Sequence, residues 1–243
     1  MTASLAPTAL LVVAHGDGGT DPRDETVRIL AERLAKRLDL PVDWATLKRP
    51  ETFAAAHARL GSAAERVAVY PLFMASGWFV RVKLPGLLAE TGFSDAEILQ
   101  VFGLDPRLVD LVEHRLRSIA SMQGGREPKD FAIALIAHGS ASGDTGSRLA
   151  SEAIAADLGY RLGTALHVGF IEEAPFFSEV IGAGVEIVVG LFVSAGTHAL
   201  DDVAALVAKT PSVVHHVANV GDDTGVADMV AATLAARVGD RVV

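Results

Sequence analysis

The sequence contains no cysteine, which excludes disulfide bonds, thiolate metal sites and iron–sulfur clusters held by this chain. No uninterrupted apolar run approaches the ~18 residues of a membrane-spanning helix, so we expect no membrane partner. The first residues lack the basic start and the small-residue cleavage pattern of a secretory signal. Together these absences predict a cytoplasmic protein.

Basic residues are also in short supply, because 21 Lys and Arg face 30 Asp and Glu, for a formal net charge of −9. Nucleic-acid binding normally requires a basic surface, so we do not expect nucleic acid as the main partner. A polyanionic small molecule would need a local basic patch. Half of the 243 residues are hydrophobic, which is ample for the core of one large or two ordinary domains.

The most informative feature that is present is an internal repeat. Strand-like apolar runs end in Ala-His-Gly within both 8–17 and 131–140. A second pair of similar segments, each ending in glycine, occupies 70–77 and 189–196. The repeat offsets are about 123 and 119 residues, and the landmarks keep the same order. This pattern predicts a duplicated domain with a site at the strand ends.

A polar segment with two glycines and a proline separates the two halves. We therefore predict an N-terminal domain over 1–122, a linker over 123–129 and a C-terminal domain over 130–243. Continuous apolar strands alternate with helical patterns, which is typical of a parallel sheet covered on both faces. The predicted fold class is α/β, with two open parallel-sheet domains. In such sheets ligands bind beyond the carboxyl ends of the strands.

The individual elements follow from hydrophobic periodicity and from turn residues. The expected helices are 24–38, 105–119, 146–158, 176–181, 200–208 and 226–238. The expected strands are 10–14, 67–73, 98–102, 132–137, 166–170, 186–193 and 213–217.

Three strand ends of the C-terminal half carry side chains with useful chemistry. His138 follows the first strand, Glu172 and Glu173 follow the second, and His198 follows the third. Two imidazoles and a carboxylate can hold a divalent cation, and a carboxylate can also accept protons. A single histidine at a strand end is more often structural. The common placement of these groups at one sheet edge favours a functional site.

Six short motifs form a specific combination: Ala14-His15-Gly16, Tyr70-Pro71-Leu72-Phe73, Leu84-Pro85, Ala137-His138-Gly139-Ser140, Phe170-Ile171-Glu172, and the run 191–198 that ends in His198. Together they resemble the class II tetrapyrrole chelatases of the CbiX and SirB type, over nearly the whole chain. The resemblance implies ATP-independent insertion of Co²⁺ or Fe²⁺ into sirohydrochlorin, in cobalamin or siroheme biosynthesis. The metal, with Ni²⁺ a third candidate, would be a substrate, and no permanently bound cofactor is expected.

The resemblance also implies roles for particular residues. His138 and His198 would bind the metal, and Glu172 would accept the protons that leave the macrocycle. Glu173 remains an alternative to Glu172, because the spacing to the following proline differs from the family pattern. Sirohydrochlorin carries many carboxylates, so basic side chains near strand ends of the first half are expected to contact it. These are Lys48, Arg49, Arg81 and Lys83.

The first half departs from this pattern. It keeps His15, but Phe79 aligns with His198, and Lys48 or Arg49 aligns with the glutamates. We therefore predict that catalysis depends on the second half. Two other classes stay open: a non-catalytic protein that binds a tetrapyrrole or a metal on the same scaffold, and a two-lobed solute-binding protein, which the missing export signal disfavours.

Overall fold

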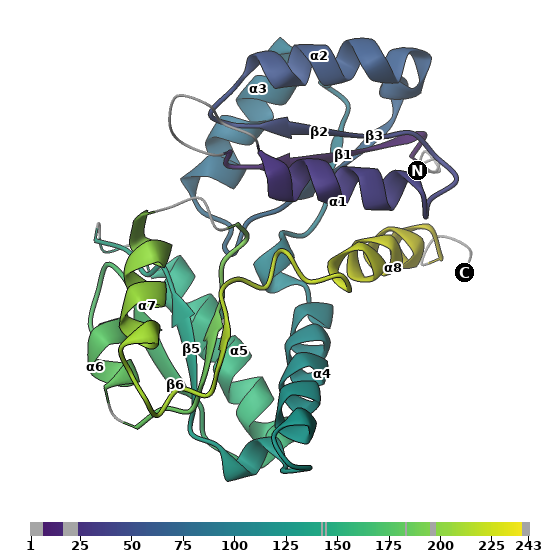
Figure 1. Ribbon diagram of the computed structural model, residues 1–243. Helices are drawn as coiled ribbons and strands as arrows, with labels where there is room; N and C mark the ends of the chain where they lie inside the picture. Colours follow the sequence, from purple (N-terminus) through teal and green to yellow (C-terminus); the bar gives the residue numbers. More distant parts are fainter. Residues whose placement is uncertain are drawn as a thin grey trace. The chain divides into compact units, whose positions relative to one another are not determined.

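The structure is a computed structural model that describes residues 7–16, 24–141, 143, 145–182, 184–194 and 198–239, without the side chains of 64, 198–200, 238 and 239. The chain divides into two compact units (Figure 1). Unit 1 comprises Met1–Asp105 and Thr224–Val243, and unit 2 comprises Pro106–Asp223. Each unit contains one four-stranded sheet in which all paired strands are parallel. The predicted duplicated α/β fold is confirmed.

Unit 1 has the strand order β2-β1-β3-β4. Every residue of β1 is buried, because the strand lies in the middle of a sheet with helices on both faces (Figure 1). On one face the strand's side chains join a core with those of α2 and α3. The strands are β1 (Ala9–Ala14), β2 (Val42–Thr46), β3 (Val67–Pro71) and β4 (Glu97–Ile98). The α-helices are α1 (Glu25–Ala35), α2 (Glu51–Leu60), α3 (Leu84–Glu90) and α8 (Val226–Gly239). Shorter turns are η1 (Gly61–Glu65), the π-helical η2 (Phe79–Lys83) and η3 (Phe102–Leu104).

Unit 2 repeats this arrangement with the order β6-β5-β7-β8, so that β5 takes the central place of β1. All five residues of β5 are buried, as expected for a continuous apolar run in a covered parallel sheet. The strands are β5 (Ile133–Ala137), β6 (His167–Phe170), β7 (Ile187–Gly190) and β8 (His215–Val217). The helices are α4 (Arg107–Met122), α5 (Gly146–Leu162), α6 (Phe177–Ile181) and α7 (His198–Ala208), with the short turn η4 (Pro128–Asp130).

The division into units differs from the predicted domains 1–122 and 130–243. Helix α4 belongs to unit 2, where Arg161 of α5 pairs with Asp110 at 2.5 Å. Helix α8 belongs to unit 1, where its Asp228 pairs with Arg37, just beyond α1. The segment 123–129 therefore joins α4 to the first strand of the same unit. The chain passes between the units after residue 105 and again after residue 223.

None of the helices in the described ranges combines the length and the apolar character that crossing a membrane would require.

The strand β8 carries two adjacent histidines whose titration should affect stability. The Nε2 atom of His216 is buried, and no described group bonds to it. Burial lowers the pKa of His216, helped by neighbouring His215, and burial together with Arg115 lowers the pKa of His215. Below about pH 6.5 the unfolded chain takes up protons that the folded protein resists, so stability present above that pH is lost as the pH falls.

We expect the His216→Phe variant, which cannot titrate at this position, to lose less stability than the parent protein between pH 7.5 and pH 5. Thermal unfolding midpoints measured across this range provide the test. Parallel profiles for the two proteins would show that the burial of His216 does not contribute to the acid sensitivity.

Candidate functional site

The loop after β5 and the turn after β6 bring His138 and Glu172 together at the carboxyl edge of the unit 2 sheet. The backbone N–H of Glu172 donates to the carbonyl oxygen of His138 at 3.0 Å, which holds the two residues side by side. Their side chains face each other, with 3.6 Å between Nδ1 of His138 and Oε2 of Glu172. Both are well exposed, at 49% and 41% of their side-chain areas. The N–H of Ala141 donates to the same Oε2 atom at 3.2 Å.

The neighbouring Glu173 has a different environment. Nε and Nη2 of Arg148 both donate to its Oε2, at 3.0 and 2.6 Å, and the N–H of Ser140 donates to its Oε1 at 3.1 Å. The hydrogen bond to Glu173 in turn raises the pKa of Arg148. Glu173 also packs against Gly139, where a Cβ atom would approach its Cγ to 2.8 Å. Glu173 is thus fixed against the loop after β5, whereas Glu172 faces the imidazole.

Arg148 was not predicted from the sequence, because neither the motif that contains His138 nor the one that contains Glu172 indicates a basic partner in α5. The internal repeat offers one. In unit 1 the start of α1 supplies the acid, Asp24, and the turn after β2 supplies the base, Arg49. In unit 2 the start of α5 supplies the base, Arg148, and the turn after β6 supplies the acid, Glu173. The ion pair occurs in both units with its charges exchanged.

His198 is the first residue of α7, which follows β7 in the chain. Its side chain lies outside the description, so its pairing with His138 stays a prediction. Among the side chains that are described, no group of three or more His, Asp or Glu residues is arranged to hold a metal ion.

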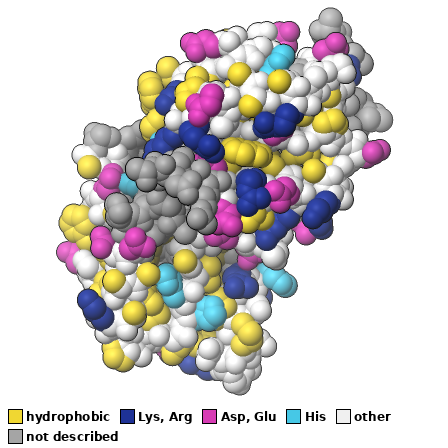
Figure 2. All heavy atoms as spheres, turned by 45° about the horizontal axis from the view of Figure 1, so that its top comes forward, with side chains coloured by type: hydrophobic (Ala, Val, Ile, Leu, Met, Phe, Trp, Pro, Cys, Tyr) yellow, Lys and Arg dark blue, Asp and Glu magenta, His cyan; other side chains and the backbone are white. Residues whose placement is uncertain are grey.

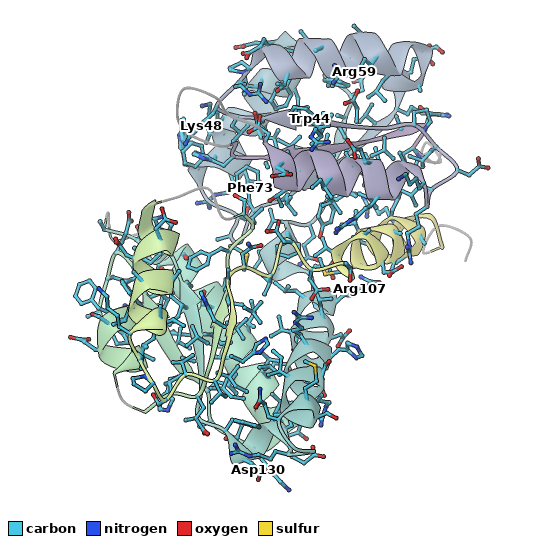
Figure 3. The ribbon with its side chains drawn as sticks, in the orientation of Figure 1. Trp44, Lys48, Arg59, Phe73, Arg107 and Asp130 are labelled. Atoms are coloured by element: carbon cyan, nitrogen blue, oxygen red, sulfur yellow. The ribbon has the colours of Figure 1, made fainter. Side chains whose placement is uncertain are left out.

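The same backbone hydrogen-bond pattern occurs at the carboxyl edge of the unit 1 sheet. The N–H of Lys48 donates to the carbonyl oxygen of His15 at 3.0 Å, which is the bond that Glu172 makes to His138 in unit 2. Lys48 therefore occupies the place of Glu172. Figure 3 labels Lys48 beyond β2.

The third strands of the two units also correspond. The N–H of Leu72, next to Phe73, donates to the sheet's central strand at 2.7 Å, as does the N–H of Leu191, next to Phe192. Phe79 lies six residues after Phe73, and His198 lies six residues after Phe192.

These correspondences define two frames of three residues. The unit 2 frame consists of His138, Glu172 and His198. The unit 1 frame consists of His15, Lys48 and Phe79. In the unit 1 frame the ring of Phe79 packs edge-on against His15, with centroids 4.8 Å apart. The unit 1 frame therefore contains Lys48 and Phe79 at the positions that match Glu172 and, by sequence spacing, His198.

The four basic residues expected to contact substrate carboxylates fall into two groups. Lys48 and Arg81 are exposed, and Lys83 is partly exposed. No carboxylate within the described ranges forms an ion pair with any of these three. Arg49, by contrast, donates from Nε to the buried Asp24 carboxylate at 2.8 Å, so it serves the unit's own structure.

The Asp24–Arg49 pair should contribute measurably to stability. The Asp24 side chain is fully buried and Arg49 is 29% exposed. In the Arg49→Met variant the buried carboxylate loses the Arg49 guanidinium, and we expect a loss of about 3–5 kcal/mol in the free energy of unfolding. Adding Asp24→Asn should recover much of this loss, since asparagine tolerates the positive φ of 47° at this position. Urea unfolding of Arg49→Met, Asp24→Asn and the double variant tests the coupling between the two residues. If the destabilisation of the double variant equals the sum of the two single ones, the residues are not coupled.

Comparison with known proteins relates this arrangement to a family. The CbiX family model matches residues 9–119. A solved CbiX, described as the terminal enzyme for the biosynthesis of siroheme in denitrifying bacteria, is 33% identical to this chain. The match covers 93% of this chain and 98% of that one, with a TM-score of 0.79. No curated protein matches the chain.

Two solved SirB structures share the fold at 20% identity. SirB from Bacillus subtilis with Fe³⁺ has a TM-score of 0.72. SirB from Bacillus subtilis subspecies spizizenii in complex with cobalt has a TM-score of 0.68. Each match covers 95% of this chain and 97% of the other.

Proposed function

Because this chain belongs to the CbiX family of class II chelatases, we propose that it inserts a divalent metal ion into sirohydrochlorin without ATP. The observation that carries the proposal is the His138–Glu172 pair, 3.6 Å apart and exposed at the carboxyl edge of the unit 2 sheet. The 33% identical relative acts in siroheme biosynthesis, which favours Fe²⁺. Co²⁺ is the second candidate and suits the same imidazole and carboxylate ligands.

Metal insertion requires two ring N–H protons to leave while a partly dehydrated cation arrives. In our proposal His138 and His198 bind the cation through neutral imidazoles, which leave its charge intact for the macrocycle nitrogens. Glu172 accepts the ring protons, a role that commonly contributes about 10²–10⁴ in rate. Nδ1 of His138 and Oε2 of Glu172 lie 3.6 Å apart. In our proposal this short distance lets the metal ligand and the proton acceptor act on the same part of the ring.

The different environments of the two glutamates support Glu172 as the proton acceptor. The lone pairs of Glu173 are used by Arg148 and by the N–H of Ser140, and protonation of Glu173 would break that pair. Glu172 is more exposed, and among the described groups its carboxylate accepts one neutral backbone hydrogen bond, from Ala141. A proton transfer to Glu172 therefore leaves the loop's ion pair intact.

A second candidate function is non-catalytic binding of a tetrapyrrole. The lysine and phenylalanine of the unit 1 frame favour it, because such a frame can bind an anionic ring without chemistry. Purified protein should be incubated with sirohydrochlorin and Co²⁺, Fe²⁺ or Ni²⁺ separately, and the macrocycle absorption followed against a protein-free control. A chelatase accelerates the absorption change of the metal complex. A binding protein shifts the spectrum of the free macrocycle and gives no rate enhancement.

A further inference from the structure

One glycine in each unit lies against the backbone that follows the strand β3 or β7. In unit 2 the N–H of Gly221 donates to the carbonyl oxygen of Phe192 at 3.1 Å. In unit 1 the N–H of Gly103 donates to the carbonyl oxygen of Phe73 at 2.9 Å. The two phenylalanines already match in the repeat, so the two glycines occupy equivalent places.

At both places the two backbones are too close together for a side chain. A Cβ atom on Gly221 would lie 2.6 Å from the carbonyl carbon of Val193, and one on Gly103 would lie 2.5 Å from that of Met74. Carbon atoms that are not bonded normally stay about 3.5–4.0 Å apart. Only glycine permits so close an approach, and an alanine at either position must displace the backbone at the strand end.

The residues against which the two glycines lie lead to different side chains. His198 follows Val193 by five residues, and Phe79 follows Met74 by the same number. Gly221 therefore lies against the start of the segment that ends at a proposed metal ligand. The equivalent segment of unit 1 ends at a phenylalanine, which cannot bind a cation through a lone pair.

Unit 2 fixes its glycine with a turn that unit 1 lacks. The side chain of buried Asn219 accepts from the N–H of Asp222 and donates to Oδ2 of the same residue, both at 2.9 Å. These two hydrogen bonds close a turn around Gly221. The matching residues of unit 1 are Val101 and Leu104, whose side chains form no hydrogen bonds. The turn closed by side chains is therefore specific to unit 2.

We propose, on the basis of the chelatase function above, that Gly221 is a positioning residue for the metal ligand His198. The missing side chain lets the segment after β8 lie against Val193, and the Asn219 turn keeps it there. An imidazole nitrogen binds a cation such as Zn²⁺ at about 2.0–2.1 Å, so a small shift of the strand end decides whether His198 reaches the metal. Misplacement by about 1 Å can cost about 10²-fold in rate even when the mutation is remote.

Titration of the folded protein with Co²⁺ alone tests this role without the macrocycle. Histidine side chains lie at separate places on the face shown in Figure 2, so binding to other imidazoles is measured with His138→Ala/His198→Ala and subtracted. Gly221→Ala should raise the Kd for Co²⁺ at least tenfold, equivalent to about 1.4 kcal/mol. Asn219→Ala loosens the turn without adding an atom, so it should raise the Kd by a smaller factor and serves if Gly221→Ala does not fold.

Gly103→Ala is the matched control, because it creates the same overlap in unit 1. It should lower the thermal unfolding midpoint about as much as Gly221→Ala does, while its Kd for Co²⁺ stays within twofold of the parent protein. In a His198→Ala background, Gly221→Ala should cause no further rise in the Kd, since the ligand that it positions is gone. A merely structural role of Gly221 would add its effect to that of His198→Ala.

The positioning role and the chelatase function can fail separately. If His198→Ala raises the Kd for Co²⁺ while folded Gly221→Ala and Asn219→Ala do not, the positioning role is refuted and the metal role of His198 stands. Equal rises in Gly103→Ala and Gly221→Ala would also refute it, and an unchanged Kd in His198→Ala would refute both roles. The expected Co²⁺ results from a protein that never accelerates metal insertion would support the positioning role and refute the proposed activity.

Discussion

Replacing Glu172 with glutamine should slow metal insertion by about 10²–10⁴-fold, the usual contribution of a general base. Glutamine preserves the size and the hydrogen-bonding capacity of the side chain but cannot accept a proton at neutral pH. Binding of the metal and of sirohydrochlorin should change much less than the rate, because the proposed metal ligands, the two imidazoles, remain. The measurement is the insertion rate at saturating metal and sirohydrochlorin, with binding titrated separately.

Glu173→Gln is the comparison that gives this result its meaning. The loss of the ion pair to Arg148 should lower the thermal unfolding midpoint, while insertion by the folded protein should fall far less than in Glu172→Gln. If Glu173→Gln loses as much activity at a temperature where it is fully folded, the proton acceptor is Glu173 or the two carboxylates act together. Full activity of Glu172→Gln would exclude Glu172 as the base.

The second large effect is expected from His198→Ala, which should abolish most metal insertion and leave the circular dichroism spectrum unchanged. A cation held by two imidazoles loses half of its protein ligands in this variant. His15→Ala should cost much less, because Phe79 stands against His15 where a second imidazole would be needed. Initial insertion rates for the two variants, measured at equal metal concentration, provide the comparison.

Two results would contradict this assignment. Equal losses in His15→Ala and His198→Ala would mean that the unit 1 frame shares in metal delivery. A fully active His138→Ala/His198→Ala double variant would remove the metal role from the unit 2 frame and return both histidines to a structural one.

The sequence predicted the two parallel sheets because their central strands are continuous apolar runs that recur in order. It placed a strand end before Lys48 but predicted no bounds for β2 or α2, since the β2 run is interrupted by Asp43. That aspartate is tolerated in the sheet because Arg59 of α2 binds both of its carboxylate oxygens, at 2.7 and 2.8 Å. The boundary between the two units could not be predicted from the sequence either. A polar segment such as 123–129 marks a turn but does not reveal which sheet the amphipathic helix before it covers.

The motifs located His138 and Glu172 because residues that follow parallel strands meet at one edge. The choice between Glu172 and Glu173 could not be made from the motif, because it depends on Arg148, which lies 25 residues away in the chain. The same reason applies to Arg49. As a basic residue at a strand end it resembled Lys48, but Asp24, also 25 residues away, engages it. Long-range ion pairs decide which charged side chains at the strand ends are engaged within the unit and which stay exposed.

The acid and the base exchange places between the Asp24–Arg49 and Arg148–Glu173 ion pairs, which limits how the two halves can recombine. A hybrid that carries the β2–α2 turn of unit 1 in place of the β6–α6 turn of unit 2 would set the guanidinium of Arg49 against that of Arg148. The reciprocal hybrid would set Glu173 against the buried Asp24, and like charges at such sites are destabilising. Viable crossovers between the repeats must therefore transfer 24–49 or 148–173 as whole blocks, so the two halves of this gene are expected to diverge in compensated pairs of charges.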